Sequence, residues 1–242
     1  YNAEMIEQIA RYPRLRDLSL FVGDPADVVP DSFGAGLPTI SEWTDRHFDY
    51  VGYVSGVPPV PDADRAEVRR ELGYSADEQV CIVTVGGSGV GGALLNRVAA
   101  AYDDVHRALP DLRMVLVAGP RIDPRSLPAQ PGLEVRAFVP DLWRHLAVCD
   151  IAVVQGGLTT TMELVANRRP FVYVPLRNHF EQQVHVRHRL DRYQAGRCAD
   201  YDDLRPAALA SMLTEELAKP VRSLPVAADG AARAATRIAA LI

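Results

Sequence analysis

Residues 157–183 read GLTTTMELVANRRPFVYVPLRNHFEQQ, and this stretch decides the fold that we expect. It follows the apolar run Ile151–Val154 and predicts a glycine turn, a short helix, a buried strand over Phe171–Val174 that Pro175 ends, and a polar loop. Ligands of open α/β sheets bind in the crevice beyond the carboxyl ends of the strands. Two successive strand ends therefore bring hydroxyls, amide N–H groups, one carboxylate and two carboxamides to one crevice. Such a set suits a ligand with phosphates and many hydroxyl groups.

The chain from residue 77 onward alternates between apolar strand-like runs and helix-like segments. This alternation predicts βαβ units, and hence an α/β fold with a doubly wound parallel sheet that helices cover on both faces. The predicted strands are Val80–Val85, Arg113–Ala118, Leu133–Ala137, Ile151–Val154, Phe171–Val174 and Gly196–Ala199. The predicted helices between them are Ala93–Ala108, Asp141–Val148, Thr160–Asn167, Glu181–Arg192 and Arg205–Leu217.

The opening segment follows a different pattern, with a helix, two short strands and a turn-rich stretch between them. It is too short for a complete α/β domain, so we expect it to be the remnant of a first α/β domain whose beginning lies outside the chain. Clustered Pro, Gly and Asp then predict a linker. The expected segments are 1–54, the end of the first domain; 55–65, the linker; 66–226, the doubly wound domain; and 227–242, a C-terminal packing helix.

The composition excludes several classes of protein. The chain has 242 residues, 48% of them hydrophobic, which is enough to form a real core. Its net charge of −5 argues against nucleic acid as a partner, because phosphate backbones select basic surfaces. The three cysteines are odd in number and far apart, which predicts reduced thiols and a reducing compartment. No apolar run approaches the roughly 20 residues that span a bilayer, and no signal peptide is visible, so we expect a cytoplasmic protein.

A glycine-rich loop, GGSGVGG at residues 86–92, follows the first strand of the predicted domain and opens a helix. Unpaired N–H groups and the helix dipole attract phosphate there, so we predict that Gly87, Ser88 and Gly89 contact a phosphate. The same loop satisfies G-x-G-x-x-G, which leaves a dinucleotide-binding enzyme open. That class carries an acid at the end of the next strand, where this chain has Ala-Gly-Pro-Arg at 118–121. Arg121 suits instead the 2′-phosphate of NADP.

Thr160 and Glu163 lie on the predicted helix that begins behind Gly156 and Gly157. A carboxylate there accepts two hydrogen bonds from the vicinal hydroxyls of a ribose. Thr160 can cap the helix or donate to a phosphate. The alternative for Glu163 is a first-turn acid that interacts with the helix dipole.

Three histidines, His179, His185 and His188, raise the question of a metal site. No acid or cysteine completes a ligand set with them, so we predict neither a metal nor a cofactor. Arginines flank these histidines and give the helix a basic face. Peripheral contact of that face with a membrane or an anionic acceptor stays open.

Together these motifs resemble the nucleotide-sugar-binding domain of GT-B glycosyltransferases. The family that they resemble most is that of the peptidoglycan N-acetylglucosaminyltransferases, which act on lipid-linked muramyl-pentapeptide. The spacing from the glycines through Thr160 and Glu163 to the two prolines and the paired glutamines matches that family without a gap. The resemblance covers about residues 80–199. It implies that Glu163 binds the ribose of UDP, that Thr160 lies by the phosphates, that residues 138–141 pack on uracil, and that Gln182 and Gln183 contact the donor sugar.

The donor-binding residues that we predict are Gly87, Ser88, Gly89, Phe138, Val139, Gly156, Gly157, Thr159, Thr160, Glu163, Glu181, Gln182 and Gln183. The sequence departs from the family at Gln155, where plant-type relatives carry a phosphate-binding histidine and the peptidoglycan enzyme an arginine. The diphosphate is therefore expected to rely more on backbone N–H groups. Asn178-His179 replaces a differently arranged loop histidine, so the donor sugar stays open. The family's catalytic base and most of its acceptor site lie in the first domain, and the catalytic residue is unknown here.

The resemblance implies a metal-independent glycosyltransferase, of which this chain supplies the donor site. The enzyme would transfer a sugar from a UDP-type or TDP-type donor to an acceptor hydroxyl with inversion. The acceptor would be a small molecule or lipid-linked, and a lipid-linked acceptor would place the protein at the inner face of the membrane. As a fragment, the chain is expected to bind nucleotide whether or not it catalyses transfer. Two alternatives stay open: a nucleotide-sugar 2-epimerase of the same fold and an NADP-dependent reductase.

Overall fold

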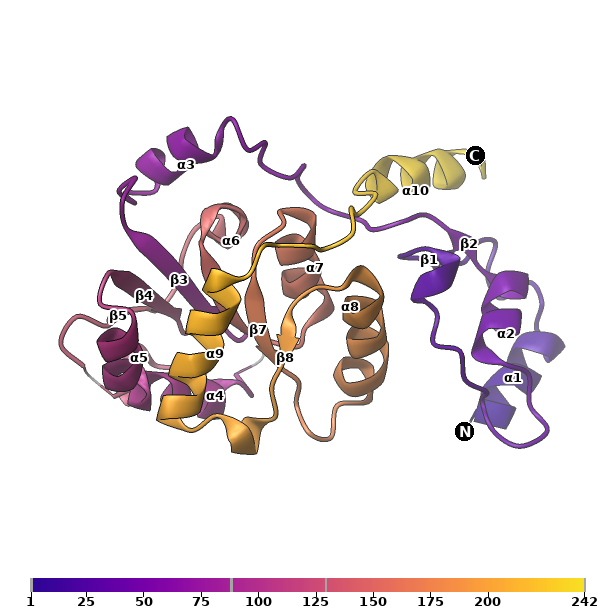
Figure 1. Cartoon of the computed structure of the whole chain (residues 1–242). Coiled ribbons are helices and arrows are strands. Elements are labelled where there is room, and N and C mark those ends of the chain that lie inside the picture. The colour runs from indigo at the N-terminus through magenta and orange to yellow at the C-terminus, as the bar shows by residue number, and fades with distance from the viewer. Residues whose placement is uncertain (1, 88, 129, 242) are drawn as a thin grey trace. The chain divides into compact units, whose positions relative to one another are not determined.

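Six parallel strands form the sheet of the larger unit, Pro59–Pro225, in the computed structural model (Figure 1). The structure describes residues 2–87, 89–128 and 130–241. The strands are β3 (Gln79–Thr84), β4 (Leu112–Val117), β5 (Glu134–Arg136), β6 (Ile151–Gln155), β7 (Phe171–Val174) and β8 (Arg197–Cys198). They lie in the order β5-β4-β3-β6-β7-β8, so the chain starts in the middle of the sheet, builds one half and then the other. The prediction of a doubly wound parallel sheet is confirmed.

Helices cover both faces of this sheet, because parallel strands need a crossover between each pair. The helices of the unit are α3 (Arg65–Glu71), α4 (Gly92–Ala100), α5 (Tyr102–Ala108), α6 (Leu142–Val148), α7 (Leu158–Ala166), α8 (Arg187–Tyr193) and α9 (Pro206–Ala218). One buried cluster joins α4, α5 and α9 to alternate residues of the strands, Val83, Met114 and Val153 among them. In Figure 1, α9 lies in front of the strands and α6 and α7 lie behind them.

Two predicted helices are interrupted. The segment predicted as Ala93–Ala108 divides at Ala101 into α4 and α5, and this break turns the rings and methyls of Tyr102 and Val105 into the core. The segment predicted as Glu181–Arg192 begins as a π-helical turn, η3 (Glu181–Val186), before α8 continues it. Such turns are rare and are frequent at functional sites. Tertiary packing decides both features, and hydrophobic periodicity carries no signal for either.

The smaller unit combines residues 1–58 with residues 226–242. It contains α1 (Asn2–Arg11), β1 (Leu20–Phe21), the 3-10 turn η1 (Pro25–Asp27), α2 (Ile40–His47), β2 (Asp49–Tyr50) and α10 (Gly230–Ala239). Strands β1 and β2 pair in parallel over two residues, whereas the sequence predicts longer strands, Leu18–Val22 and one near Tyr50–Val54. Gly230 fixes the start of α10, because a Cβ there would lie 2.4 Å from the carbonyl oxygen of Tyr53. The assignment of residues 1–54 to the end of an acceptor domain stays a prediction.

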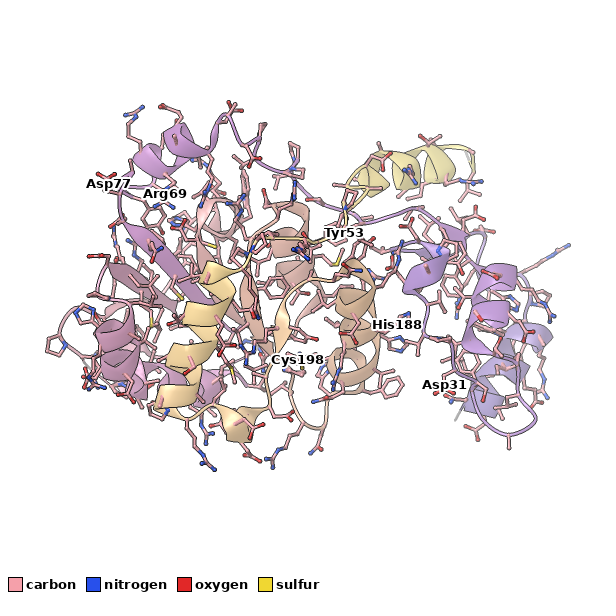
Figure 2. The ribbon with its side chains drawn as sticks, in the orientation of Figure 1. Asp31, Tyr53, Arg69, Asp77, His188 and Cys198 are labelled. Atoms are coloured by element: carbon pink, nitrogen blue, oxygen red, sulfur yellow. The ribbon has the colours of Figure 1, made fainter. Side chains whose placement is uncertain are left out.

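The cysteines carry no disulfide: Cys81 and Cys149 are buried, and Cys198 on β8 is half-buried (Figure 2). Among the described helices, none combines the length and the apolar character that crossing a membrane requires.

Asp150 ties together the amino ends of the strands. Its Oδ1 accepts a hydrogen bond from Arg65 (2.8 Å), and its Oδ2 accepts from Arg69 (2.9 Å) and from the N–H of Val80 (2.8 Å). The Arg69 side chain, labelled on α3 in Figure 2, is only 8% exposed and also donates to three backbone carbonyls. Because its charge has a partner, Arg69 can stay buried. It anchors α3 to the start of β3 and to the turn before β6.

A buried histidine lies next to this region. His145 on α6 is 5% exposed, and its Nδ1 lies 2.5 Å from the hydroxyl of Tyr74. Burial, together with nearby arginines such as Arg136, lowers the pKa of His145 to about 4 from an ordinary 6.5. The folded protein therefore keeps this imidazole neutral at a pH where the unfolded chain would protonate it.

We expect the free energy of unfolding to fall as the pH drops from 6.5 to about 4, because the unfolded chain binds a proton at His145 that the folded chain excludes. The loss should amount to about 3 kcal/mol. His145→Gln should remove most of this pH dependence in urea unfolding at pH 7, 5.5 and 4.5. His106→Gln, at an exposed position, is the control. An equal pH slope in His145→Gln and the wild type would contradict the assignment.

The carboxyl end of α7 carries an arginine where a glycine is usual. The N–H of Arg168 donates to Val165 O (3.0 Å) and the N–H of Arg169 donates to Leu164 O (2.9 Å), which is the Schellman pattern. Arg168 itself adopts φ of +53°, a left-handed conformation that favours glycine. A side chain with a Cβ is strained there by about 1 kcal/mol.

We expect Arg168→Gly to stabilise the protein by about 1 kcal/mol, because glycine adopts this conformation without strain. Urea unfolding measures the change. Arg107→Gly is the matched control: its site lies inside α5, in right-handed helix, and glycine should cost about 1 kcal/mol there. If both substitutions destabilise equally, the left-handed strain is not what Arg168 contributes.

Candidate functional site

The site begins where the strand order reverses, at the carboxyl ends of β3 and β6. Gly86 and Gly89 in the loop after β3 have φ of +73° and +84°. A Cβ on Gly91 would lie 2.2 Å from that of Val85, and one on Gly119 would lie 2.9 Å from the carbonyl oxygen of Gly86. Glycine is therefore required for this loop to pack against the end of β3 and against the loop after β4. Backbone N–H groups can approach a ligand closely here.

Of the three predicted phosphate contacts in this loop, Gly87 is exposed and Gly89 is half-buried. Ser88 lies outside the described residues. No described residue accepts a hydrogen bond from the N–H of Gly87 or Gly89. The loop thus leaves two donors for a ligand.

The second turn of the site follows β6. Gly156 is buried, and a Cβ there would lie 3.2 Å from the Cα of Pro175, so this glycine lets the turns after β6 and β7 meet. Gly157 is the N-cap of α7 and provides no side-chain cap. The first N–H groups of a helix have no partner within it, and they carry the positive end of the helix dipole. The α7 N-terminus therefore suits an anion at the switch point.

The threonines of α7 differ in their roles. Thr161 is fully buried, and its hydroxyl donates to Gly157 O (2.9 Å) and Leu158 O (3.1 Å), so it holds the helix start together. Thr159 is exposed and Thr160 is half-buried. Thr160 and Glu163 are three positions apart and so share one side of the helix.

Glu163 is half-buried, and no described residue donates a hydrogen bond to its carboxylate or forms an ion pair with it. Burial raises the pKa of this carboxyl group above its ordinary value. A carboxylate that loses water without gaining a partner destabilises the folded state. An interaction with the helix dipole alone does not explain why the carboxylate of Glu163 is half-buried, because an exposed acid interacts with the dipole as well.

Both predicted sugar-contacting glutamines brace the loop after β7. Gln182 Oε1 accepts from the N–H of Leu176 (2.9 Å). Gln183 Nε2 donates to the carbonyl oxygens of Leu176 (3.0 Å) and Pro175 (3.5 Å). Each carboxamide therefore keeps one polar end, Nε2 of Gln182 and Oε1 of Gln183, without a described protein partner. Glu181, which precedes them, is exposed.

The two residues predicted to contact the nucleobase differ in exposure. Phe138 is 69% exposed, and Val139 is 4% exposed and packs in the core. Phe138 therefore presents an aromatic face to solvent in the loop between β5 and α6. Like all the predicted contacts described here, these two lie at the carboxyl edge of the sheet, where the loops after β3, β5, β6 and β7 gather.

The structure adds a cavity that the sequence did not predict. It has a volume of about 290 Å³ and is lined mainly by apolar side chains from the start of α4, the end of β7 and the loop that follows β7, with Tyr201 at one side. Gln155 is the buried polar residue of this lining: it is 7% exposed, and no described residue hydrogen bonds to its carboxamide. An ion pair between Arg177 and Asp202 lies at the same cavity. Tyr201 comes from a 3-10 turn after β8, and its sequence context carries no sign of this placement.

The three histidines do not assemble a metal site with other residues. No group of three or more His, Cys, Asp or Glu residues within the described chain is arranged to hold a metal ion. His179 Nδ1 instead accepts from the N–H of Gln182 (3.4 Å), and the ring of His185 packs edge-on against Phe180. Burial lowers the pKa of His185, so its imidazole favours the neutral form.

We expect Glu163→Gln to raise the free energy of unfolding by about 1 kcal/mol at pH 7, because glutamine removes a half-buried charge without a partner. The folded pKa is raised, so the gain should appear as the pH rises above 4.5 and disappear below it, where the carboxyl group is neutral in both states. Urea unfolding at pH 3.5 and pH 7 tests this. Glu181→Gln is the exposed control, and a loss of stability in Glu163→Gln would mean that the carboxylate has a stabilising partner.

Known proteins resemble this chain in sequence and in fold. An uncharacterized glycosyltransferase of Methanopyrus kandleri is 27% identical over 219 residues, which cover 89% of this chain and 60% of that protein. The UDP-N-acetylglucosamine–N-acetylmuramyl-(pentapeptide) pyrophosphoryl-undecaprenol N-acetylglucosamine transferase of Corynebacterium efficiens is 32% identical over 161 residues, 66% of this chain and 43% of that protein. The chain thus spans less than two thirds of the length of these curated relatives.

Among solved structures, the calicheamicin glycosyltransferase CalG4 superposes with a TM-score of 0.63 at 19% identity, over 98% of this chain and 59% of that one. This likeness concerns the fold. The profile of the glycosyltransferase family 28 C-terminal domain matches residues 80–242, which is more than half of the chain and includes all the predicted donor contacts. The chain therefore belongs to glycosyltransferase family 28 and carries its C-terminal domain in a GT-B fold.

Proposed function

We propose that this chain binds the nucleotide-sugar donor of a glycosyl transfer, with a UDP-type or TDP-type nucleotide. The observation that carries the proposal is the half-buried carboxylate of Glu163, one turn into a helix whose N-terminus has no side-chain cap. An unpartnered carboxylate beside an open anion site calls for a ligand that is anionic at one end and offers hydroxyl donors at the other. A nucleoside diphosphate has that combination.

The ribose would supply the missing partners of Glu163. Two vicinal hydroxyls can donate to the two oxygens of one carboxylate, and hydrogen bonds to a charged group contribute about 1.5–3 kcal/mol each. Binding would thereby offset the cost of burying the charge. In the free protein the unpartnered carboxylate of Glu163 destabilises the fold. Binding of the ribose would remove this destabilisation, and this would increase the affinity for the nucleotide.

The diphosphate would lie between the α7 N-terminus and the loop of Gly87 and Gly89. Donors from both elements would stabilise the charge that develops on the departing diphosphate, which is the usual way a protein assists a leaving group of this kind. Gln155 has no charge to add, so the backbone donors and the helix dipole would carry this role. In this proposal the transfer needs no metal or other cofactor.

The two ends of the donor would reach the remaining predicted contacts. Phe138 offers an exposed ring for a pyrimidine base, and aromatic stacking on a base contributes about 1–3 kcal/mol. The unpartnered ends of Gln182 and Gln183 would meet hydroxyls of the sugar, with the exposed Glu181 nearby. The hydrogen bonds that Gln182 and Gln183 form with the loop after β7 would hold both carboxamides in place before the donor binds.

An acceptor hydroxyl would attack the anomeric carbon with inversion, while a general base removes its proton. We assign no residue of this chain to that base, which is expected in a first domain. The acceptor would be a small molecule or lipid-linked. The curated relative from Corynebacterium efficiens is named for a pyrophosphoryl-undecaprenol acceptor, which is consistent with a cytoplasmic protein that works at the inner face of a membrane.

Calorimetric titration of the chain with UDP, TDP and NADPH in parallel tests the proposal. We expect micromolar binding of UDP or TDP and no heat from NADPH. Glu163→Ala should weaken nucleotide binding more than tenfold, because it removes two hydrogen bonds to a charged group. Glu215→Ala, at an exposed acid of α9, is the control.

Two results would count against the proposal. An unchanged dissociation constant in Glu163→Ala would remove the ribose role of this residue. Binding of NADPH without binding of UDP or TDP would favour the NADP-dependent reductase, with Arg121 at the 2′-phosphate.

A further inference from the structure

The opposite edge of the sheet holds a second cavity, of about 430 Å³, at the amino ends of the strands. Its described lining contains more cations than anions, in a chain whose net charge is −5. The charged residues of the lining are Arg65, Arg168, Arg169, Lys219, Asp62 and Asp150. An excess of positive charge in a surface hollow attracts anions.

The two acids compensate this excess only in part. Asp150 accepts hydrogen bonds from both Arg65 and Arg69 and from the backbone of Val80, so its single negative charge is shared between two arginines. Asp62 is 89% exposed and lies 3.5 Å from Arg169, a distance at which an exposed pair contributes little. Lys219 has a carboxylate partner outside the cavity lining, Glu216. The positive charge of the cavity therefore comes mainly from its arginines.

Two arginines of this cavity, Arg168 and Arg169, have unused hydrogen-bonding capacity. The Nε of Arg65 also has no acceptor among the described residues, but it is buried and does not face the hollow. The side chain of Arg169 is 13% exposed; its Nε donates to Asn167 O (2.6 Å), and its Nη2 has only the exposed Asp62, at 3.5 Å, as a described acidic partner. Arg168 donates only a long bond, of 3.5 Å, to Val221 O. Burial first, and then the neighbouring Arg65, lower the pKa of Arg169.

Arg168 also stands out by its backbone conformation, independently of its charge. It occupies the left-handed position of the Schellman turn, where a glycine would be unstrained. The strain persists although the side chain makes only a long hydrogen bond within the protein. A local cost of this kind is often associated with a function of the residue.

We propose that this cavity is a binding site for a phosphate group, separate from the donor site. Several arginines around one hollow suit phosphate, because the guanidinium group donates in pairs to its oxygens and stays charged when buried. A phosphate dianion would balance the excess charge and accept hydrogen bonds from Arg168 and Arg169. The site lies at the amino ends of the strands, whereas the candidate donor contacts lie at the carboxyl ends, so one ligand group cannot fill both.

Calorimetry with inorganic pyrophosphate on the full chain, saturated with UDP, tests this proposal. The nucleotide occupies the donor site and leaves the second site to the probe. We expect one further pyrophosphate to bind, at least fivefold more weakly in Arg168→Gly and in Arg169→Gln. Arg168→Gly is the sharper variant, since it removes the charge and should stabilise the fold. Arg107→Gln, at an exposed arginine of α5, should bind pyrophosphate like the wild type.

Equal pyrophosphate binding in wild type, Arg168→Gly and Arg169→Gln would overturn the proposal, as would no binding to the saturated protein. The result is separable from the donor proposal. If UDP does not bind, the same variants are titrated with pyrophosphate alone, and a loss in Arg168→Gly still identifies the second site. If Glu163→Ala also weakens pyrophosphate binding in that titration, the probe occupies the donor site and the second site is rejected.

Vesicles distinguish the source of the phosphate. Cosedimentation with phosphatidylcholine vesicles that contain phosphatidic acid, absent with phosphatidylcholine alone and reduced in Arg168→Gly, would identify a lipid headgroup. Pyrophosphate binding without cosedimentation would identify a soluble phosphate compound. Cosedimentation that Arg168→Gly and Arg169→Gln leave unchanged would place lipid contact elsewhere on the protein and would not support this site.

Discussion

The structure depends on one constraint: all strands of the larger sheet run in the same direction, and the chain begins in the middle of that sheet. Every crossover must therefore return from the carboxyl edge to the amino edge, and the order reverses between β3 and β6. Helices diverge from that point and leave a crevice between the turns that follow the two strands. Gly86 adopts a left-handed conformation in one of these turns, and Gly156 lets the turn after β6 approach Pro175 closely.

Much of this arrangement can be predicted from the sequence. The strands are buried on both faces and read as uninterrupted apolar runs, and glycine or proline ends many of them. The gathering of Gly87, Gly157 and Glu163 at one edge follows from the parallel direction alone. Three features could not be predicted, because contacts distant in sequence decide them: the break at Ala101, the π-helical turn at Glu181–Val186, and the cavity beside Gln155. Exposure also separates Phe138 from Val139, which the pattern treats alike.

Polar groups on α7 are divided between holding the fold and remaining unpaired. The hydroxyl of Thr161 donates a hydrogen bond to Gly157 O at the start of the helix, whereas the carboxylate of Glu163, two residues later, is half-buried without a described partner. Neither end of α7 has the residue that would stabilise it most. Its N-terminus has no side-chain cap, and its C-terminus is followed by Arg168 in a strained left-handed conformation. A chain selected for stability alone would cap the first and place glycine at the second. The departures fall where an anion would bind, at both edges of the sheet.

The smaller unit is built from two segments that are far apart in the chain, with the larger unit inserted between them. Residues 59–225 form a contiguous piece and can fold as soon as they have been synthesised. The smaller unit cannot be completed at that stage, because its second segment supplies α10 and the carbonyl oxygen of Ala227, which accepts a hydrogen bond from the N–H of Tyr53. Closing a loop of that length costs entropy, and a larger unit that is already folded shortens the distance to be closed. We therefore expect the inserted unit, residues 59–225, to fold first, and the smaller unit, which consists of residues 1–58 and 226–242, to fold last.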